Sequence, residues 1–223
     1  MRIDILTLFP EMFSPLETSL IKKATDKRLF SLNIINIRDF SQDKHKKCDD
    51  YPFGGGAGLV MTPDPIVRAI KSIYGYKKAT KIYMSPKGET LNQNKLISLS
   101  KINHLIILCG HYEGVDQRVL DNYIDEEISL GDFVLTGGEI PAMALVDGVS
   151  RYIKGVLHNE ESTADESFSG EYLEYPHYTR PQVFEGISVP EVLVSGDHKK
   201  IADWRKEQSL IITKNRRPDL LKK

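Results

Sequence analysis

Three glycine-bearing segments follow three apolar, strand-like segments, and they carry the strongest chemical signal in the sequence. They are residues 85–88, 110–114 and 131–138. Glycine lets a backbone approach a ligand closely, so the N–H and C=O groups of such loops can contact the edge of an adenine. Ligands of parallel sheets bind at the carboxyl ends of the strands, so we expect the three loops to converge there. Each loop alone could be a tight turn that needs positive φ, but three in register favour a nucleoside site.

The sequence has no motif for the other common glycine-dependent sites or for a metal site. The sequence has no P-loop, and the first strand is followed by Pro10-Glu11-Met12 in place of a GxGxxG turn. His111 and Glu113 match the HxE of zinc deaminases, but no PCxxC follows. The two cysteines form no CxxC and no Cys/His ligand set, which argues against a zinc site or a disulfide framework. We therefore assign no metal ligands and expect a reducing cytoplasm.

The charge pattern suggests a polyanionic partner. The net charge of −1 excludes a bulk polycation that coats nucleic acid. Residues 160–176 nevertheless carry six acids and no base, and residues 199–223 carry nine bases against three acids. A second basic cluster, Lys44, Lys46 and Lys47, precedes a glycine-rich loop. These clusters could be solvated surfaces, or they could contact phosphates.

Apolar periodicity predicts the elements that position these loops. Strands are expected at residues 2–8, 32–37, 81–84, 104–109 and 125–130, and helices at 14–28, 63–74, 91–100, 115–123 and 139–154. For the first helix, Ser14 is the expected N-cap and Pro15 the first helical residue. Residues 38–62 are expected to be a long loop. Strands that alternate with helices indicate an α/β fold with a mostly parallel sheet.

The remaining chain predicts a second, smaller domain. Residues 1–158 form the expected α/β domain, 159–172 a flexible acidic linker, and 173–223 a small helical C-terminal domain with helices near 190–195 and 200–213. No apolar run approaches 18 residues, so no membrane span is expected. The first six residues contain an acid inside a short apolar run, which is typical of a strand and not of a signal peptide.

Five ordered motifs identify a family resemblance. They are TLFPEMF at residues 7–13, DDYPFGGG at 49–56, LCGHYEGVD at 108–116, SLGDFVLTGGE at 129–139 and PHYTRP at 176–181. Together they closely resemble the bacterial tRNA (guanine-N1)-methyltransferases of the TrmD type, over nearly the whole chain. The resemblance implies a SPOUT-type α/β domain with a deep trefoil knot, which periodicity cannot show and base rates disfavour.

The resemblance also implies the ligands and their sites. S-adenosylmethionine would be the methyl donor, the guanine directly 3′ of the anticodon in certain tRNAs the acceptor, and the enzyme a homodimer whose sites are completed by the partner's C-terminal domain. A magnesium requirement is implied, although no separate metal motif is evident. The residues expected to bind the donor are Tyr83, Met84, Ser85, Pro86, Gly88, Gly110, Tyr112, Glu113, Gly114, Leu130, Gly131, Asp132, Phe133, Val134, Leu135, Gly137, Gly138 and Pro141.

The chemistry of guanine N1 requires a base and a cation. N1 carries a proton at neutral pH, and removing it places negative charge on O6, so a carboxylate and a positive group are needed. Arg151 matches the position of the family's catalytic arginine, although it could equally be a favourable helix C-terminal charge. The family's base is an aspartate directly before Ser-Phe, whereas here Glu166 holds that position and Asp165 lies one residue earlier. Spacing favours Glu166, and Asp165 is the alternative.

Contacts to tRNA are expected from the C-terminal domain. The residues are His177, Tyr178, Arg180, Lys199, Lys200, Arg205, Arg216 and Arg217. Two other classes of function compete with a tRNA methyltransferase. One is a non-catalytic RNA-binding protein on the same scaffold, and the other is an enzyme that acts on a small nucleotide. The intact loops and the Arg151–acid set argue against the first, and the separate basic clusters argue against the second.

Overall fold

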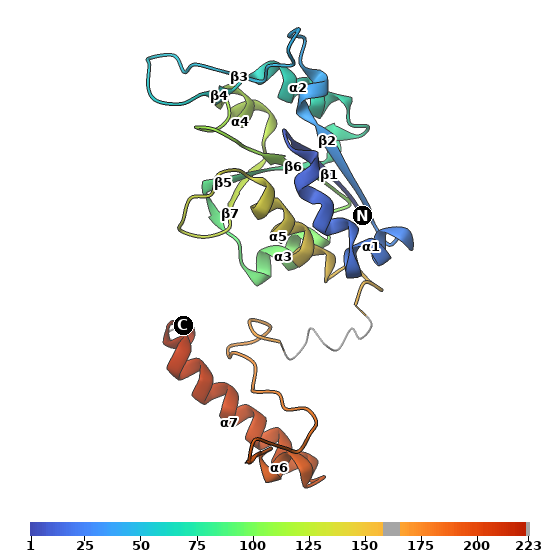
Figure 1. Ribbon diagram of the computed structural model, residues 1–223, viewed down its shortest axis with the longest axis vertical. Coiled ribbons are helices and arrows are strands. Elements are labelled where there is room, and N and C mark those ends of the chain that lie inside the picture. Colours follow the sequence, from blue (N-terminus) through green and yellow to red (C-terminus); the bar gives the residue numbers. More distant parts are fainter. Residues whose placement is uncertain (158–165, 222–223) are drawn as a thin grey trace. The chain divides into compact units, whose positions relative to one another are not determined.

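The structure is a computed structural model, and it describes residues 1–157 and 166–221 (Figure 1). The chain divides into two compact units, Met1–His158 and Asn159–Lys223. Each unit has its own secondary structure and is described by itself. The segment expected to be a linker, residues 159–172, lies partly outside the described residues, and the candidate base Asp165 lies outside them entirely.

A five-stranded sheet forms the centre of the first unit. Its order is β2-β1-β6-β5-β7, and every neighbouring pair is parallel. The strands are β1 (Arg2–Thr7), β2 (Ser31–Asn36), β5 (Thr80–Thr90), β6 (His104–Cys109) and β7 (Glu126–Ser129). The predicted α/β fold with a parallel central sheet is therefore confirmed. Parallel neighbours need crossover connections, and the helices between the strands supply them.

Different helices cover the two faces of the sheet (Figure 1). Because successive side chains of a strand point to opposite faces, β1 sends Ile3 and Ile5 into one core cluster and Leu6 into the other. The first cluster takes residues from α1 (Ser19–Asp26), α3 (Gln93–Ser100) and α5 (Glu139–Ser150). The second cluster takes residues from α2 (Pro63–Ser72) and α4 (Gln117–Tyr123).

The first helix differs from the prediction. The expected single helix over 14–28 is wrong, because a 3₁₀ helix spans Pro10–Glu17 and α1 begins only at Ser19. Pro10 starts the 3₁₀ helix, so the turn begins before the predicted cap at Ser14, and Pro15 lies inside it. Thr18 then adopts extended dihedrals (φ −128°, ψ 169°), which separate the two helices. A continuous α-helix that began at Pro10 would need a backbone N–H at residue 15, and Pro15 has none.

Strand β5 is longer than the predicted 81–84. It pairs with β7 up to Met84, shifts register, and pairs again from Glu89. The intervening residues 85–88 are the first glycine-bearing segment, so this segment is a bulge within a strand and not a loop at its end. Gly88 lies so close to the backbone of Glu127 and Ile128 that a Cβ atom would overlap it. The bulge thus fits only because residue 88 has no side chain.

The long segment 38–62 contains short elements of its own. A 3₁₀ helix spans Ile37–Phe40, and β3 (Asp49–Asp50) pairs antiparallel with β4 (Val60–Met61). The N–H of Met61 donates to the carbonyl of Gly114 at 2.9 Å, which attaches this segment to the second glycine-bearing loop. A further 3₁₀ helix spans Tyr76–Lys78.

The second unit contains a long helix and a short hairpin. Its elements are β8 (Val183–Phe184), β9 (Ile187–Ser188), α6 (Glu191–Val194), α7 (His198–Arg216) and a 3₁₀ helix at Pro218–Leu221. The two α-helices lie where the sequence predicts them, and α7 extends further at both ends. The hairpin was not predicted. Thr213, buried on α7, accepts a hydrogen bond from the N–H of Leu173 at 2.8 Å, which anchors the start of the unit on the helix.

Candidate active site

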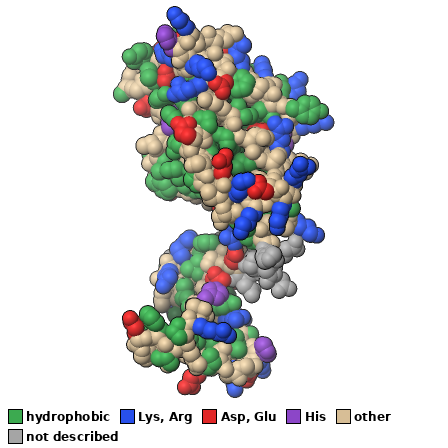
Figure 2. Space-filling model, turned by 45° about the vertical axis from the view of Figure 1, so that its right-hand side comes forward, with side chains coloured by type: hydrophobic (Ala, Val, Ile, Leu, Met, Phe, Trp, Pro, Cys, Tyr) green, Lys and Arg blue, Asp and Glu red, His purple; other side chains and the backbone are tan. Residues whose placement is uncertain are grey.

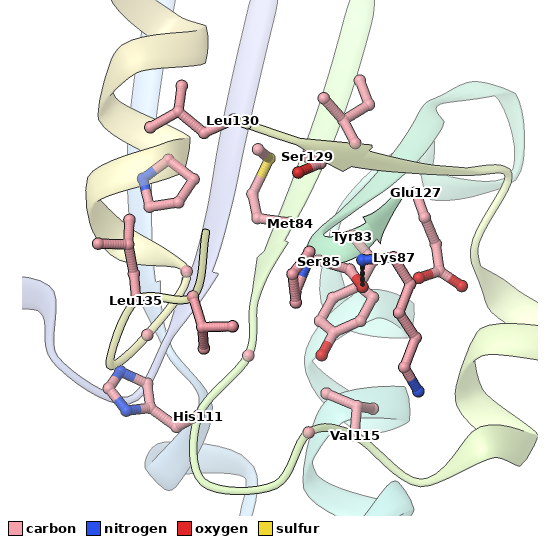
Figure 3. Close-up of a pocket in the computed structure, with 18 of the residues that line it drawn as sticks. Tyr83, Met84, Ser85, Lys87, His111, Val115, Glu127, Ser129, Leu130 and Leu135 are labelled. Carbon is pink, nitrogen blue, oxygen red and sulfur yellow. Dashed lines mark hydrogen bonds between the residues drawn. The ribbon is translucent and has the colours of Figure 1, made fainter. Parts of the chain in front are cut away.

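The three glycine-bearing segments meet around one cavity in the first unit (Figure 3). Its volume is about 270 Å³, close to the lower end of the roughly 300–1,000 Å³ typical of small-molecule sites. The walls come from the β5 bulge, from the loops after β6 and β7, and from the start of α5. The predicted residues that line it are Tyr83, Met84, Ser85, Pro86, Gly110, Tyr112, Glu113, Gly114, Leu130, Phe133, Val134, Leu135, Gly137, Gly138 and Pro141.

Three predicted residues lie beside the cavity and not on its wall. Gly88 packs against the backbone of β7. Gly131 lies under the ring of Phe133, since a Cβ atom there would come within 2.7 Å of the ring. Asp132, between Gly131 and Phe133 in the sequence, is exposed and does not line the cavity.

The cavity also has wall residues that were not among those expected to bind the donor. They are Lys87, His111, Val115, Gln117, Leu120, Glu127, Ile128, Ser129 and Thr136. Lys87, His111 and Thr136 lie inside the glycine-bearing segments, so the segments themselves were the available signal. The sequence contained no signal for the wall residues of α4 and β7, because only the fold brings them next to the bulge of β5.

Close backbone contact explains the glycines of the second and third segments. A Cβ atom on Gly138 would lie 2.8 Å from the Cα of Cys109 and 2.9 Å from the N of Gly110. The N–H of Gly138 donates to the carbonyl of Gly110 at 2.9 Å. A Cβ atom on Gly110 would lie 2.6 Å from the hydroxyl of Tyr83. The segments therefore pack backbone against backbone, as the glycine pattern predicts.

A buried network ties the second segment to α5. The carboxylate of Glu139 is fully buried at the start of this helix. It accepts a hydrogen bond from Thr7 Oγ1 at 2.6 Å, and its other oxygen lies 2.7 Å from His111 Nε2. The ring of Phe9 packs on that imidazole with centroids 4.7 Å apart. A buried carboxylate needs such partners, so the network fixes the loop at His111 relative to the helix.

Burial also sets the protonation of groups around the cavity. It raises the pKa of Tyr83 to about 12, and the nearby Glu127 carboxylate adds to the effect. The phenol therefore stays protonated at neutral pH and can donate a hydrogen bond. Burial raises the pKa of Cys109 well above its ordinary value, with a contribution from Glu139. This thiol is not a nucleophile at neutral pH.

The lining of the cavity suits a nucleoside that carries charged groups. It has a wall lined by backbone groups where a side chain cannot be accommodated, and an apolar part formed by Leu130, Leu135 and Pro141. The first feature suits the polar edge of an adenine and the second suits its faces. Other parts of the wall carry Lys87, Glu113 and Glu127, which suit the charged remainder of such a molecule.

Comparison with known proteins gives the family. The family model described as tRNA (Guanine-1)-methyltransferase TrmD matches residues 1–223. The chain belongs to this family. Among its relatives, a tRNA (guanine-N(1)-)-methyltransferase of Clostridium botulinum (strain Kyoto / Type A2) is 58% identical over 100% of this chain and 92% of its own. Another of the same name, from Clostridioides difficile (strain 630), is 55% identical over 100% and 98%. The predicted family and enzyme class, a tRNA (guanine-N1)-methyltransferase, are confirmed.

The two catalytic candidates of this TrmD family member lie in different units. Arg151 caps the C-terminus of α5, and its N–H donates to the carbonyl of Asp147 at 3.3 Å. Glu166 is the first described residue of the second unit, and its carbonyl accepts the N–H of Ser169 at 3.0 Å. Ser167 Oγ accepts the N–H of Glu174 at 3.0 Å, so hydrogen bonds hold the backbone after the candidate base. The alternative base, Asp165, lies outside the described residues.

The candidate tRNA contacts lie on the second unit. Lys199, Lys200, Arg205 and Arg216 are residues of α7, and Arg217 is its C-cap. Lys200 pairs with Asp197 at 3.2 Å, Arg217 with Asp219 at 2.6 Å, and the guanidinium of Arg205 lies 4.7 Å from the centroid of Tyr175. His177 Nε2 lies 2.8 Å from Glu174, the rings of Tyr178 and Trp204 have centroids 6.3 Å apart, and Arg180 is exposed. Figure 2 shows basic side chains on the surface of both units.

The described residues contain neither a membrane-spanning helix nor a metal-binding cluster. Over residues 1–157 and 166–221, no helix has the length and apolar character to cross a bilayer. Within the same ranges, no group of three or more His, Cys, Asp or Glu side chains could hold a metal ion. Both cysteines are free and buried.

The Gly131 position allows a test of the third loop. A valine there would displace the Phe133 ring, which is a wall residue and more than half exposed. Gly131→Val should weaken S-adenosylmethionine binding by about tenfold or more, roughly 1.4 kcal/mol, with the melting temperature nearly unchanged. Calorimetric titration measures this. Gly170→Val is the control, because nothing lies within 4 Å of a Cβ atom there. Wild-type affinity in the Gly131 variant would contradict the proposed role of this loop.

Proposed function

We propose that this protein transfers the methyl group of S-adenosylmethionine to N1 of the guanine directly 3′ of the anticodon in tRNA. The observation that carries the proposal is the cavity where the three glycine-bearing segments meet, in a chain that matches the TrmD family over its full length. Because tRNA is the acceptor, the protein would act in the cytoplasm. The proposal is tested by incubating purified protein with labelled S-adenosylmethionine and unmodified tRNA. Incorporation of label supports it, and binding of both without incorporation favours a non-catalytic RNA-binding protein.

The donor is proposed to bind in the cavity with its adenine at the apolar end. Backbone groups of residues 130–138 would contact the purine edge, and Leu130, Leu135 and Pro141 its faces. When bound, S-adenosylmethionine supplies an electrophilic methyl group and leaves as a neutral thioether, so no acid is needed for the leaving group. The trefoil knot is also part of the proposal. The tight packing of Gly138 on Cys109 and Gly110 supports a close crossing of chain segments there.

Proton removal at guanine N1 is assigned to the second unit. Glu166 is proposed to accept the N1 proton, with Asp165 as the alternative. Negative charge then develops on O6, and the guanidinium of Arg151 is proposed to stabilise it. The side chain of Arg151 is half-buried at the end of α5, which carries its own partial negative charge at that end. Without a substrate, this end of the helix is a favourable place for a cation.

The proposed enzyme is a homodimer, as the family resemblance implies, and the proposed base and cation belong to different compact units of the chain. Each site would combine Arg151 of one protomer with the acidic segment of its partner. Residues 1–158 are proposed as the donor-binding domain, 159–172 as the linker and 173–223 as the tRNA-binding domain. A magnesium requirement is part of the proposal, but no described residue is assigned to hold the ion.

The basic side chains of α7 are proposed to contact the tRNA backbone. Affinity for tRNA should then fall steeply with salt. Lys199→Gln combined with Lys206→Gln should weaken all tRNA substrates alike and reduce the slope of log K against log salt by about 1–2. Filter binding at several salt concentrations measures the slope. The control is Lys101→Gln with Lys27→Gln, two exposed lysines of the first unit. An unchanged slope in the α7 variant would mean that this face is only solvated.

A further inference from the structure

The segment that follows the candidate base is attached to one face of α7. The N–H of Leu173 donates to Thr213 Oγ1 at 2.8 Å, and Thr213 is fully buried on the helix. Arg217 lies four residues further along and caps the helix, with its N–H on the carbonyl of Thr213 at 2.8 Å. Residues four apart on a helix lie on the same face. Arg217 is therefore expected on the side of α7 that meets this segment.

The guanidinium of Arg217 does contact the segment. Its Cζ atom lies 5.8 Å from the centroid of the Phe168 ring, within the roughly 6 Å of a cation–π contact. Asp219 fixes the guanidinium, because its carboxylate accepts hydrogen bonds from Nε at 2.9 Å and from Nη2 at 2.6 Å. A guanidinium held by two such bonds has a defined orientation, and its charge is already paired. Arg217 thus differs from an arginine whose guanidinium is open to a phosphate.

Phe168 has a backbone conformation that its surroundings must impose. Its φ is +72°, in the left-handed region that bulky side chains rarely adopt. The ring is 46% exposed, so burial in a core does not account for the conformation. The N–H of Ser169 donates to the carbonyl of Glu166 at 3.0 Å, which closes a tight turn around this residue. Such strained residues persist where several contacts fix them, and they cluster at functional sites.

We propose that Arg217 is a positioning residue for methyl transfer, which holds the Phe168 ring and thereby orients Glu166. Glu166 lies two residues before Phe168 in the same turn, so a movement of the ring shifts the candidate base. A misplacement of about 1 Å can cost up to 10²-fold in rate. The inference rests on the proposed function, because it concerns the base of that reaction. It gives Arg217 a different role from the phosphate contact expected from the sequence.

The first test replaces the arginine. Arg217→Gln should slow single-turnover methylation about five- to twentyfold at saturating tRNA and donor, less than loss of the base itself. The affinity for tRNA should change less than about twofold and the slope of log K against log salt should be that of wild type, because no phosphate contact is lost. Arg217→Lys should not restore the rate, since an ammonium cannot pair with Asp219 through two parallel bonds.

The control breaks an equivalent ion pair elsewhere. Arg68 of α2 pairs with Asp64 at 2.7 Å, and its side chain is 44% exposed, against 46% for Arg217. Arg68→Gln should leave the rate, the tRNA affinity and the salt slope unchanged. Single-turnover assays and filter binding at several salt concentrations measure all three quantities for each variant.

The second test changes the ring and leaves the ion pair in place. Phe168→Leu removes the aromatic face and should slow the same step by a factor similar to that of Arg217→Gln. Phe168→Tyr should keep the wild-type rate, because its ring offers the same face to the guanidinium. Added to Arg217→Gln, Phe168→Leu should slow the step by less than about a further twofold, since both changes remove one contact. If Arg217→Gln does not fold, the two ring variants decide the question.

The contrary outcomes separate this inference from the proposed function. If Arg217→Gln weakens tRNA binding and flattens the salt slope with an unchanged saturated rate, Arg217 is a phosphate contact and the inference is wrong. If Phe168→Leu keeps the wild-type rate, or its effect multiplies fully with that of Arg217→Gln, the inference is also wrong. None of these results touches methyl transfer by wild-type protein or its dependence on Glu166. If wild-type protein transfers no methyl group, or Glu166→Gln matches its rate, the proposed reaction or its base fails, and the inference fails with it.

Discussion

Replacement of Glu166 by glutamine is expected to slow methyl transfer by about 10²–10⁴-fold, the usual cost of losing a general base. Glutamine keeps the size of the side chain but cannot take the N1 proton of guanine. Binding of S-adenosylmethionine should be unchanged, because the cavity lies in the first unit and Glu166 in the second. Single-turnover methylation of tRNA with saturating donor measures the rate, and calorimetry measures the donor affinity.

The neighbouring acid provides the comparison for this variant. Asp165→Asn removes the same charge one residue away, and it should slow transfer by less than about tenfold. Glu166 directly precedes Ser167-Phe168, as the family's base does, and its extra methylene lengthens the side chain by about one C–C bond. A reversed result would show that the shorter Asp165 is the base.

Replacement of Arg151 by glutamine should slow the same step by about 10²–10³-fold, as the loss of one donor to a developing oxyanion usually does. Both tRNA and donor affinity should change little, because the interaction with O6 strengthens only as the N1 proton leaves. Single-turnover rates at saturating donor separate this effect from binding. Lys154→Gln is the control, an exposed cation three residues further on. A loss of tRNA affinity with an unchanged rate would place Arg151 in binding and not in catalysis.

Mixing the two inactive variants tests the shared site. If each site combines Arg151 of one protomer with Glu166 of its partner, a heterodimer of the two variants has one intact site and one doubly altered site. Mixing under conditions of subunit exchange should then restore a substantial part of the activity. If both residues came from the same protomer, every site would lack one of them and activity would stay low. Light scattering on the same samples shows whether the protein is a dimer.

The parallel sheet could be predicted because its strands are buried on both faces. The segment that became β6, HLIILC, is almost continuously apolar, and the one that became β1, RIDILT, carries Ile3, Ile5 and Leu6. Such segments between helical segments indicate a parallel sheet. The same order places the glycine-bearing segments at neighbouring strands, and most residues of the cavity followed from that alone. Ile3 and Ile5 pack in one core cluster and Leu6 in the other, so β1 is buried on both faces of the sheet.

Features that depend on contacts between distant segments could not be predicted. The β5 bulge exists because Gly88 meets the backbone of β7, about forty residues away in sequence. Glu127 lines the cavity only because β7 pairs with β5, so the local sequence could not indicate that it belongs to the site. The break at Thr18 depends on backbone dihedrals that Ser14 and Pro15 do not specify, since both also suit the start of an α-helix. Local sequence patterns fix which segments are strands and helices, but not these register details.

The central claim is most directly tested by locating the transferred methyl group. Wild-type protein is incubated with labelled S-adenosylmethionine and either an unmodified tRNA with guanine directly 3′ of the anticodon or the same tRNA with adenine there. Nuclease digestion then identifies the modified nucleoside. We predict label in N1-methylguanosine from the first tRNA and none from the second. Equal labelling of both tRNAs, or label in a different nucleoside, would contradict the proposed reaction.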